Sequence, residues 1–158
     1  MEINEFIMQH EKSIRMGFFF GMLLIMALWE ILAPRRALTV SKLLRWSNNL
    51  GLVFFNSFVL RLLFPAAAVG MAAFVSEQGW GLLNYYHLPL GLAVLISVVT
   101  LDLIIYLQHV MVHAVPLLWR LHRVHHADPD YDVTTGARFH PLEIILSMLI
   151  KFAVIIVL

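Results

Sequence analysis

Long apolar stretches alternate with short polar segments along this chain of 158 residues. The apolar stretches cover residues 16–32, 50–75, 88–107 and 142–158. A helix needs about 20 apolar residues to cross the hydrocarbon core of a bilayer. Each stretch therefore predicts a membrane-spanning helix. The second stretch contains Asn56, Arg61 and Pro65, and we expect it to be tilted, kinked or split.

The overall composition supports a membrane protein. Hydrophobic residues make up 61% of the chain and charged residues 13%, whereas a soluble domain has about 45–50% and 25%. We therefore expect an all-α, multi-span transmembrane fold with about four membrane helices, forming one membrane domain over residues 1–158. The formal net charge of +1 is too small, and the chain too apolar, to indicate a nucleic-acid surface. Because the chain has no cysteine, disulfides and thiolate metal ligands are excluded, and nitrogen or oxygen must bind any metal.

The distribution of basic residues predicts the orientation in the membrane. Short cytoplasmic loops are rich in Lys and Arg. Here the basic residues gather in the first loop and in the histidine-rich loop, and the middle loop has none: Arg35, Arg36, Lys42 and Arg45, then Arg120, Arg123 and Arg138. With four spans, both basic loops lie on the same face, which we predict to be cytoplasmic. The first fifteen residues contain three glutamates, so we expect the first apolar stretch to remain as an anchor rather than to be cleaved.

Polar side chains recur at helical spacing at the end of the third apolar stretch. Asp102, Tyr106, His109 and His113 follow one another at steps of four, three and four, so they share one face of a helix. An ionisable group inside a span costs roughly 2.5–3.5 kcal/mol, and such groups usually face a protein interior or a functional site. Asp102 should therefore have a partner. His109 is about 10 Å away along the axis, so Tyr106 or a neighbouring helix is the better candidate.

A second histidine group follows shortly after. His122 shares a helix face with both His125 and His126 if this segment is helical. Pro116 should break the preceding helix and allow the second group to fold back towards the first. The alternative interpretation of this segment is a basic amphipathic helix at the lipid headgroups.

The number of histidines predicts the kind of site. Neutral imidazole suits zinc, copper, iron and nickel, and a catalytic zinc typically has three protein ligands. The cluster has five histidines, and His140 lies close by in the sequence; this excess favours two metal ions. For His140 we keep open a role as ligand, as support for a ligand, or as a contact to a substrate headgroup. His10 and His87 stand alone, and we expect them to be solvated.

Acidic residues near the histidines are candidates to orient them. A ligating imidazole usually donates its other N–H to a carboxylate or a carbonyl, and Asp128, Asp130, Asp132 and Glu143 are available. The spacing does not select one of them. For Asp130 and Asp132 we favour a solvated loop. Arg138 is expected to contact a lipid phosphate, a redox partner or simply the headgroup surface.

Taken together, these motifs resemble the fatty acid hydroxylase and sterol desaturase superfamily. The resemblance rests on Asp102 and Tyr106, on QHVMVH at 108–113, on LWRLHRVHH at 118–126 and on TTGARFHPLE at 134–143. It implies a multi-span membrane enzyme with a non-haem di-metal centre, taken to be di-iron when active, with zinc as a possible substitute. Such enzymes hydroxylate or desaturate lipids with dioxygen and electrons from an external donor of cytochrome or ferredoxin type.

The resemblance also assigns roles to individual residues. It makes His109 and His113 metal ligands of a first box and His122, His125 and His126 ligands of a second box. We add Asp102 and Tyr106 as candidates that support catalysis as neighbours of the metal ligands, without binding the metal themselves. The family has a third histidine box, which this chain lacks before it stops at Leu158 within an apolar stretch. We therefore expect the chain to be the N-terminal part of a longer enzyme domain.

Other functions remain as alternatives at this stage. A zinc-binding membrane hydrolase would also use histidines near the bilayer, although the HExxH pattern of such enzymes is missing. A metal transporter would place its ligands near the middle of several spans. An inactive family member that acts as a membrane scaffold would fit the missing third box. The substrate stays open among fatty acyl, sterol and sphingolipid types, and the reaction between hydroxylation and desaturation.

Overall fold

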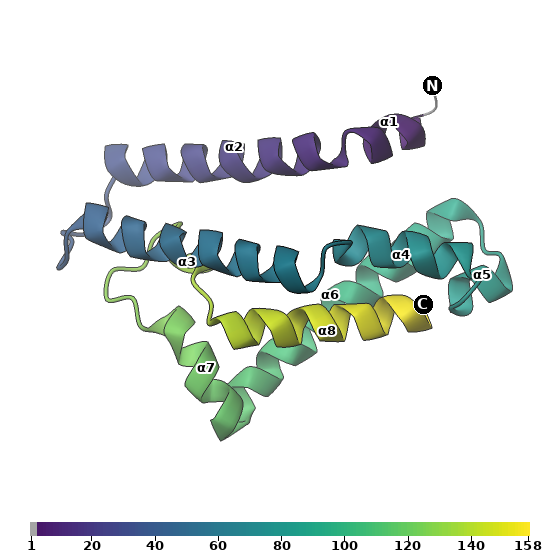
Figure 1. Ribbon diagram of the computed structural model, residues 1–158. Helices are drawn as coiled ribbons and strands as arrows, with labels where there is room; N and C mark the ends of the chain where they lie inside the picture. The colour runs from purple at the N-terminus through teal and green to yellow at the C-terminus, as the bar shows by residue number, and fades with distance from the viewer. Residues whose placement is uncertain (1–2) are drawn as a thin grey trace.

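Helices make up most of the computed structural model, which describes residues 3–158 (Figure 1). No strand occurs in that range, so the prediction of an all-α fold is confirmed. The helices are α1 (Ile3–Gln9), α2 (Glu11–Leu32), α3 (Lys42–Leu63), α4 (Ala67–Glu77), α5 (Leu82–Tyr86), α6 (Leu90–Ala114), α7 (Pro116–His126), the short 3-10 helix η1 (Thr135–Ala137) and α8 (Pro141–Val157).

Three helical segments are long and apolar enough to cross a membrane. They are α2 with 22 residues, the combined α3 and α4 segment Lys42–Glu77 with 36, and α6 with 25. The fourth predicted span folds as α8, whose 17 residues lie at the lower end of the length that a bilayer requires. The membrane-like, all-α character is thus shown, and the number of spans remains a prediction.

A proline splits the second predicted span, as we expected. Helix α3 ends at Leu63 and α4 begins at Ala67, with Pro65 between them. Proline disfavours a helical backbone at the residue before it, and Phe64 has φ −131° and ψ 67°. After the break, α4 packs along α8, and the ring of Phe64, at the end of α3, meets that of Phe152 of α8 edge to face at 5.3 Å.

A second proline turns the chain between α6 and α7. Val115 is extended, with φ −93° and ψ 116°, and Pro116 takes the first position of α7, where proline needs no N–H partner. The two helices form a V at the bottom of Figure 1. The predicted helix break at Pro116 is confirmed, and the V brings the end of α6 against α7.

The described residues bury polar side chains more often than apolar ones. The buried apolar residues are Ala27, Val75 and Val112, whereas nine polar or charged residues are buried: Arg45, Asn49, Asn56, His122, Asp130, Asp132, Thr134, Thr135 and Glu143. Large apolar side chains such as Phe18 and Phe58 face outward. This distribution suits a surface in contact with lipid, because polar groups in a bilayer must find their partners inside the protein.

Candidate metal centre

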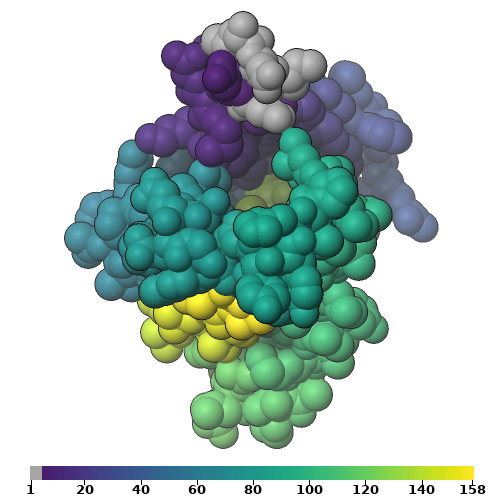
Figure 2. Space-filling model, turned by 90° about the vertical axis from the view of Figure 1, so that its right-hand side faces the viewer, coloured from purple at the N-terminus to yellow at the C-terminus, as the bar shows by residue number. Residues whose placement is uncertain are grey.

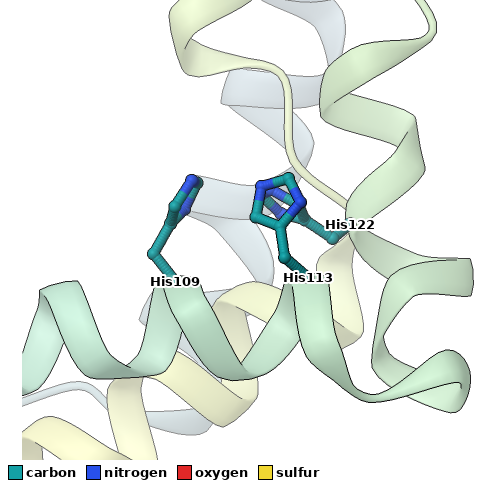
Figure 3. A group of neighbouring side chains, drawn as sticks. All are labelled: His109, His113 and His122. Atoms are coloured by element: carbon teal, nitrogen blue, oxygen red, sulfur yellow. The ribbon is translucent and has the colours of Figure 1, made fainter.

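Three histidines meet at the corner between α6 and α7. His109 and His113 lie one turn apart on α6, and their ring centres are 4.8 Å apart. The ring of His122 on α7 is 4.8 Å from the first and 4.7 Å from the second. Figure 3 shows the three rings turned towards one another. Each offers a nitrogen, and the three nitrogens lie within 4.8 Å of one another, so one cation could contact all of them.

The other two histidines of α7 lie beside this group. The Nε2 atom of His126 is 3.2 Å from Nε2 of His122, and its ring centre is 5.0 Å from that of His113. His125 lies 5.4 Å from His122 between ring centres and stacks almost parallel on Phe139 at 4.7 Å. All five predicted histidines are therefore gathered at one place, and their role as ligands stays a prediction.

His140 has a different local role. It is the N-terminal capping residue of α8, and its Nδ1 atom accepts the backbone N–H of Leu142 at 3.1 Å. A capping side chain satisfies one of the free N–H groups at a helix start. Its second ring nitrogen is still available, so a further role as a ligand remains a prediction.

A buried carboxylate from α8 orients His122. The Oε1 atom of Glu143 lies 2.7 Å from Nδ1 of His122, and the Glu143 side chain is almost completely buried. Burial raises the pKa of Glu143, and the nearby histidines counteract this; in its ionised form the carboxylate can only accept, and the Nδ1–H of His122 then donates to it. The Nε2 lone pair of His122 is then left facing the neighbouring histidines. Of the four acidic candidates, the structure thus selects Glu143.

The electrostatic environment keeps the histidines of α7 neutral. Burial lowers the pKa of His122 to about 4, and the proximity of His109 and His113 lowers it further. Burial, followed by the neighbouring histidines, also lowers the pKa of His125 and of His126. Neutral imidazoles have the free lone pair that a metal requires.

Two buried atoms beside the cluster have no hydrogen-bond partner among the described residues. They are Oε2 of Glu143 and Nδ1 of His125. Buried polar atoms normally have a partner, and exceptions often mark a site for an ion or a water. The donor set and these unsatisfied atoms together fit a bound metal ion.

The two supporting candidates on α6 lie apart from these contacts. Asp102 and Tyr106 are both exposed. Neither side chain forms a hydrogen bond within residues 3–158, so the partner that we expected for Asp102 is not found there. Their role in catalysis stays a prediction.

The loop between α7 and η1 differs from our expectation of a solvated loop. Asp130 and Asp132 are 1% and 7% exposed, so the prediction that they are solvated was wrong. The backbone N–H groups of Thr39 and Val40 donate to Asp130. The indole N–H of Trp46 donates to Asp132 at 2.9 Å. Distant parts of the chain supply the partners that make this burial possible.

Arg45 of α3 is buried and forms ion pairs with the same loop. Its Nε and one terminal nitrogen donate to the two oxygens of Asp128 at 2.6 and 2.9 Å, and it also pairs with Asp132. Burial would raise the pKa of Asp128, but hydrogen bonds from Arg45, Asn49 and Thr135 lower it to about 2. Arg45, which the sequence predicts to lie in the first loop, is a buried residue of α3.

The sequence contains a signal for this contact that our interpretation missed. Arg45, Asn49 and Asn56 are all buried, and their spacing of four and seven places them on one face of α3. This is the same kind of polar stripe as the one on α6. Asn49 contacts Asp128 and Thr134, and Asn56 donates to the carbonyl of Phe139 at 2.9 Å. We expected Arg138 to contact a lipid phosphate, a redox partner or the headgroup surface; its terminal nitrogen lies 3.4 Å from Oδ1 of Asn49.

Comparison with known proteins agrees with the histidine motifs. The model of the fatty acid hydroxylase family matches residues 94–158, a range that contains most of α6 together with α7 and α8. The match includes the five clustered histidines and Glu143, and it confirms the resemblance to this family. Neither the curated proteins nor the solved structures contain a match to the chain.

Proposed function

We propose, from the similarity of residues 94–158 to the fatty acid hydroxylases, that this protein is a membrane-bound non-haem di-iron oxygenase. It hydroxylates or desaturates a lipid of fatty acyl, sterol or sphingolipid type, using dioxygen and electrons from an external donor. The observation that carries the proposal is the meeting of histidines from α6 and α7 within the region similar to that family.

The proposed ligands are the five clustered histidines, with His140 as a further candidate. When bound, iron supplies the oxidising power that attacks an unactivated C–H bond, which side chains cannot supply. The protein's own groups hold the ligands in place. Glu143 accepts the Nδ1–H of His122 and so keeps its Nε2 lone pair directed at the cluster. The negative charge of Glu143 also offsets part of the charge of the cations.

The position of the cluster suits a lipid substrate. His109 and His113 are exposed near the end of α6. Most outward-facing residues before them on this helix are apolar, such as Leu103 and Leu107; Asp102 and Tyr106 are the polar exceptions on the histidine face. A lipid chain can therefore approach along the apolar surface of α6. We place the histidines on the cytoplasmic side, where a cytochrome or a ferredoxin can deliver electrons. The positive-inside rule supports this orientation.

A zinc-binding membrane hydrolase is the second candidate. The three nitrogens of His109, His113 and His122 equal the number of protein ligands at a catalytic zinc. The two candidates differ in the metal and its amount. The oxygenase requires two irons per chain, and the hydrolase one zinc. A membrane scaffold requires neither.

Metal analysis of the purified full chain tests the proposal. We expect two irons per chain in the protein as purified, and a loss of at least half of this iron in the His125→Ala/His126→Ala double variant. His10→Asn/His87→Asn is the matched control and should keep its iron, because these histidines lie outside the cluster; asparagine tolerates the positive φ at His87. One zinc per chain, no metal at all, or unchanged iron in the double alanine variant would contradict the proposal.

A further inference from the structure

Helix α2 lies over a groove that has two parts. The first is a cavity of about 620 Å³ at the C-terminal end of α2. The second is a cavity of about 460 Å³ that lies closer to the N-terminus of the same helix. Met26 lines both cavities, so the two parts adjoin. Figure 2 looks into a hollow beneath the purple helices, between teal segments on either side.

The second part of the groove is apolar. Its α2 wall includes Phe18, Phe19 and Met22, and the opposite wall includes Leu50 and Ala137; no charged residue lines it. Phe18, Phe19 and Met22 are exposed, and Ala27 is the one buried residue of α2 in the described range. From Phe19 to Ala33 the face of α2 above the groove is about 21 Å long. An extended acyl chain can lie along such a face.

The first part of the groove is cationic. Arg35, Arg36 and Lys42 line it. Arg36 donates to the carbonyl of Pro129 at 3.0 Å. Arg35 and Lys42 form no ion pair with any carboxylate in the part of the chain that the structure describes. Positive charge is therefore available for an anion.

Two acidic residues also line this cavity. Asp132 pairs with Arg45. One oxygen of Glu30 accepts the backbone N–H of Val133 at 2.9 Å, and its other oxygen has no partner among the described residues, so the three cationic side chains outnumber the one carboxylate without a counter-charge. The exposed aromatic side chains Trp29 and Tyr131 complete the wall. Tryptophan and tyrosine prefer the headgroup level of a membrane, which is also where α2, a candidate span that ends at Leu32, should leave the hydrocarbon.

We propose that this groove binds an anionic phospholipid. Its phosphate lies between Arg35 and Lys42, and one acyl chain runs along the apolar face of α2. The order of charge along the groove carries this assignment, because a cationic end followed by an apolar end complements an anionic headgroup followed by a hydrocarbon chain. No histidine lines either cavity, so this site is separate from the metal centre and independent of the proposed reaction.

Binding measurements on the purified full chain in detergent test the headgroup contact. The probes are phosphatidylglycerol and phosphatidylcholine with identical acyl chains, titrated and followed by native mass spectrometry. One basic residue near an anionic lipid changes affinity by about fivefold. We therefore expect Arg35→Gln/Lys42→Gln to weaken phosphatidylglycerol binding by roughly 25-fold. Arg120→Gln/Arg123→Gln removes the same charge from the exposed surface of α7 and should change binding less than about twofold.

A second pair of variants tests the acyl-chain contact. Met26→Trp fills the junction of the two cavities and should weaken binding of both lipids by about tenfold. Leu24→Trp adds the same side chain to an exposed position of α2 that lines neither cavity, and it should leave binding unchanged.

Three results would overturn the proposal. The first is equal affinity for the two lipids. The second is equal loss of binding in a test variant and its matched control. The third is displacement of the lipid by inorganic phosphate at equal concentration, which would show a site for free anions instead of a lipid.

Discussion

The contact between Glu143 and His122 links the start of α8 to the centre of the histidine cluster. His122 has no exposed surface, so the orientation of its ring depends on what holds Nδ1. The carboxylate at 2.7 Å fixes the tautomer in which Nε2 is free to bind a cation. This one hydrogen bond therefore decides whether the most buried histidine can act as a ligand.

Replacing this carboxylate should weaken metal binding. Glu143→Gln keeps the size of the side chain but removes its charge, and we expect metal affinity to fall by about 10–100-fold, as for other residues that orient metal ligands. Competition with a chelator of known affinity measures the change. Glu77→Gln, at an exposed position at the end of α4, is the control. Equal metal affinity in both variants would show that Glu143 does not orient a ligand.

The low pKa of His122 predicts a pH dependence of stability in the metal-free protein. The folded-state pKa is about 4, below the ordinary value of 6.5, so the unfolded chain binds more protons between these two values. The contribution of His122 to the free energy of unfolding is therefore fully present above pH 6.5, and it is lost as the pH falls towards about 4. Thermal unfolding of chelator-treated protein at several pH values checks this. His122→Asn should show a smaller loss over the same range, and an equal loss would contradict the assignment.

At the scale of elements, the polar stripe of α3 holds the loop that follows the second histidine group. Arg45 contacts Asp128 and Asp132, and Asn49 joins Asp128 to Thr134. This loop connects α7 with α8, which carry His122 and Glu143. The stripe thus fixes the relative position of two helices that form the site.

Breaking the buried ion pair should destabilise the protein strongly. We expect Arg45→Met to lower the free energy of unfolding by about 3–5 kcal/mol, because it leaves buried carboxylates without their counter-charge. Arg61→Met makes the same substitution at an exposed position of α3, and it should change the free energy of unfolding by less than about 0.5 kcal/mol. Unfolding by denaturant in detergent micelles measures both. Small effects of similar size in both variants would show that the buried ion pair contributes little to the free energy of unfolding.

Sequence predicted the breaks between helices better than it predicted the burial of the loop. The effects of Pro65 and Pro116 are local, since proline restricts the backbone beside it. The burial of Asp130 depends on the N–H of Thr39, which lies 91 residues away in the chain. No pattern around Asp130 itself reveals that partner, and charge alone suggested a solvated loop.

At the scale of the whole molecule, the sequence predicted that the histidines lie together, but it did not predict which carboxylate orients them. His109, His113 and His122 come from two consecutive helices joined by a tight turn, so helical spacing and one proline suffice to bring them together. Glu143 comes from α8, and spacing could not distinguish it from three aspartates. The groove beneath α2 depends on how that helix lies against distant loops, and the periodicity of apolar residues in the sequence does not predict this arrangement.

Orientation in the membrane can be tested directly because the chain contains no cysteine. The positive-inside rule predicts that Arg123 of α7 faces the cytoplasm and that Gln78, after α4, faces the opposite side. A membrane-impermeant maleimide added to intact cells should therefore label Gln78→Cys and leave Arg123→Cys unlabelled until the cells are opened. The reverse pattern would show the histidine cluster to be outside.

The scarcity of buried apolar side chains has a thermodynamic consequence. Unfolding usually raises the heat capacity because water comes to surround apolar surface that was hidden before. In this protein Ala27, Val75 and Val112 are the apolar residues hidden by the fold within the described range, and the remaining apolar surface is covered by lipid in either state. Calorimetric curves should accordingly show little change in baseline across the transition, and stability should vary almost linearly with temperature.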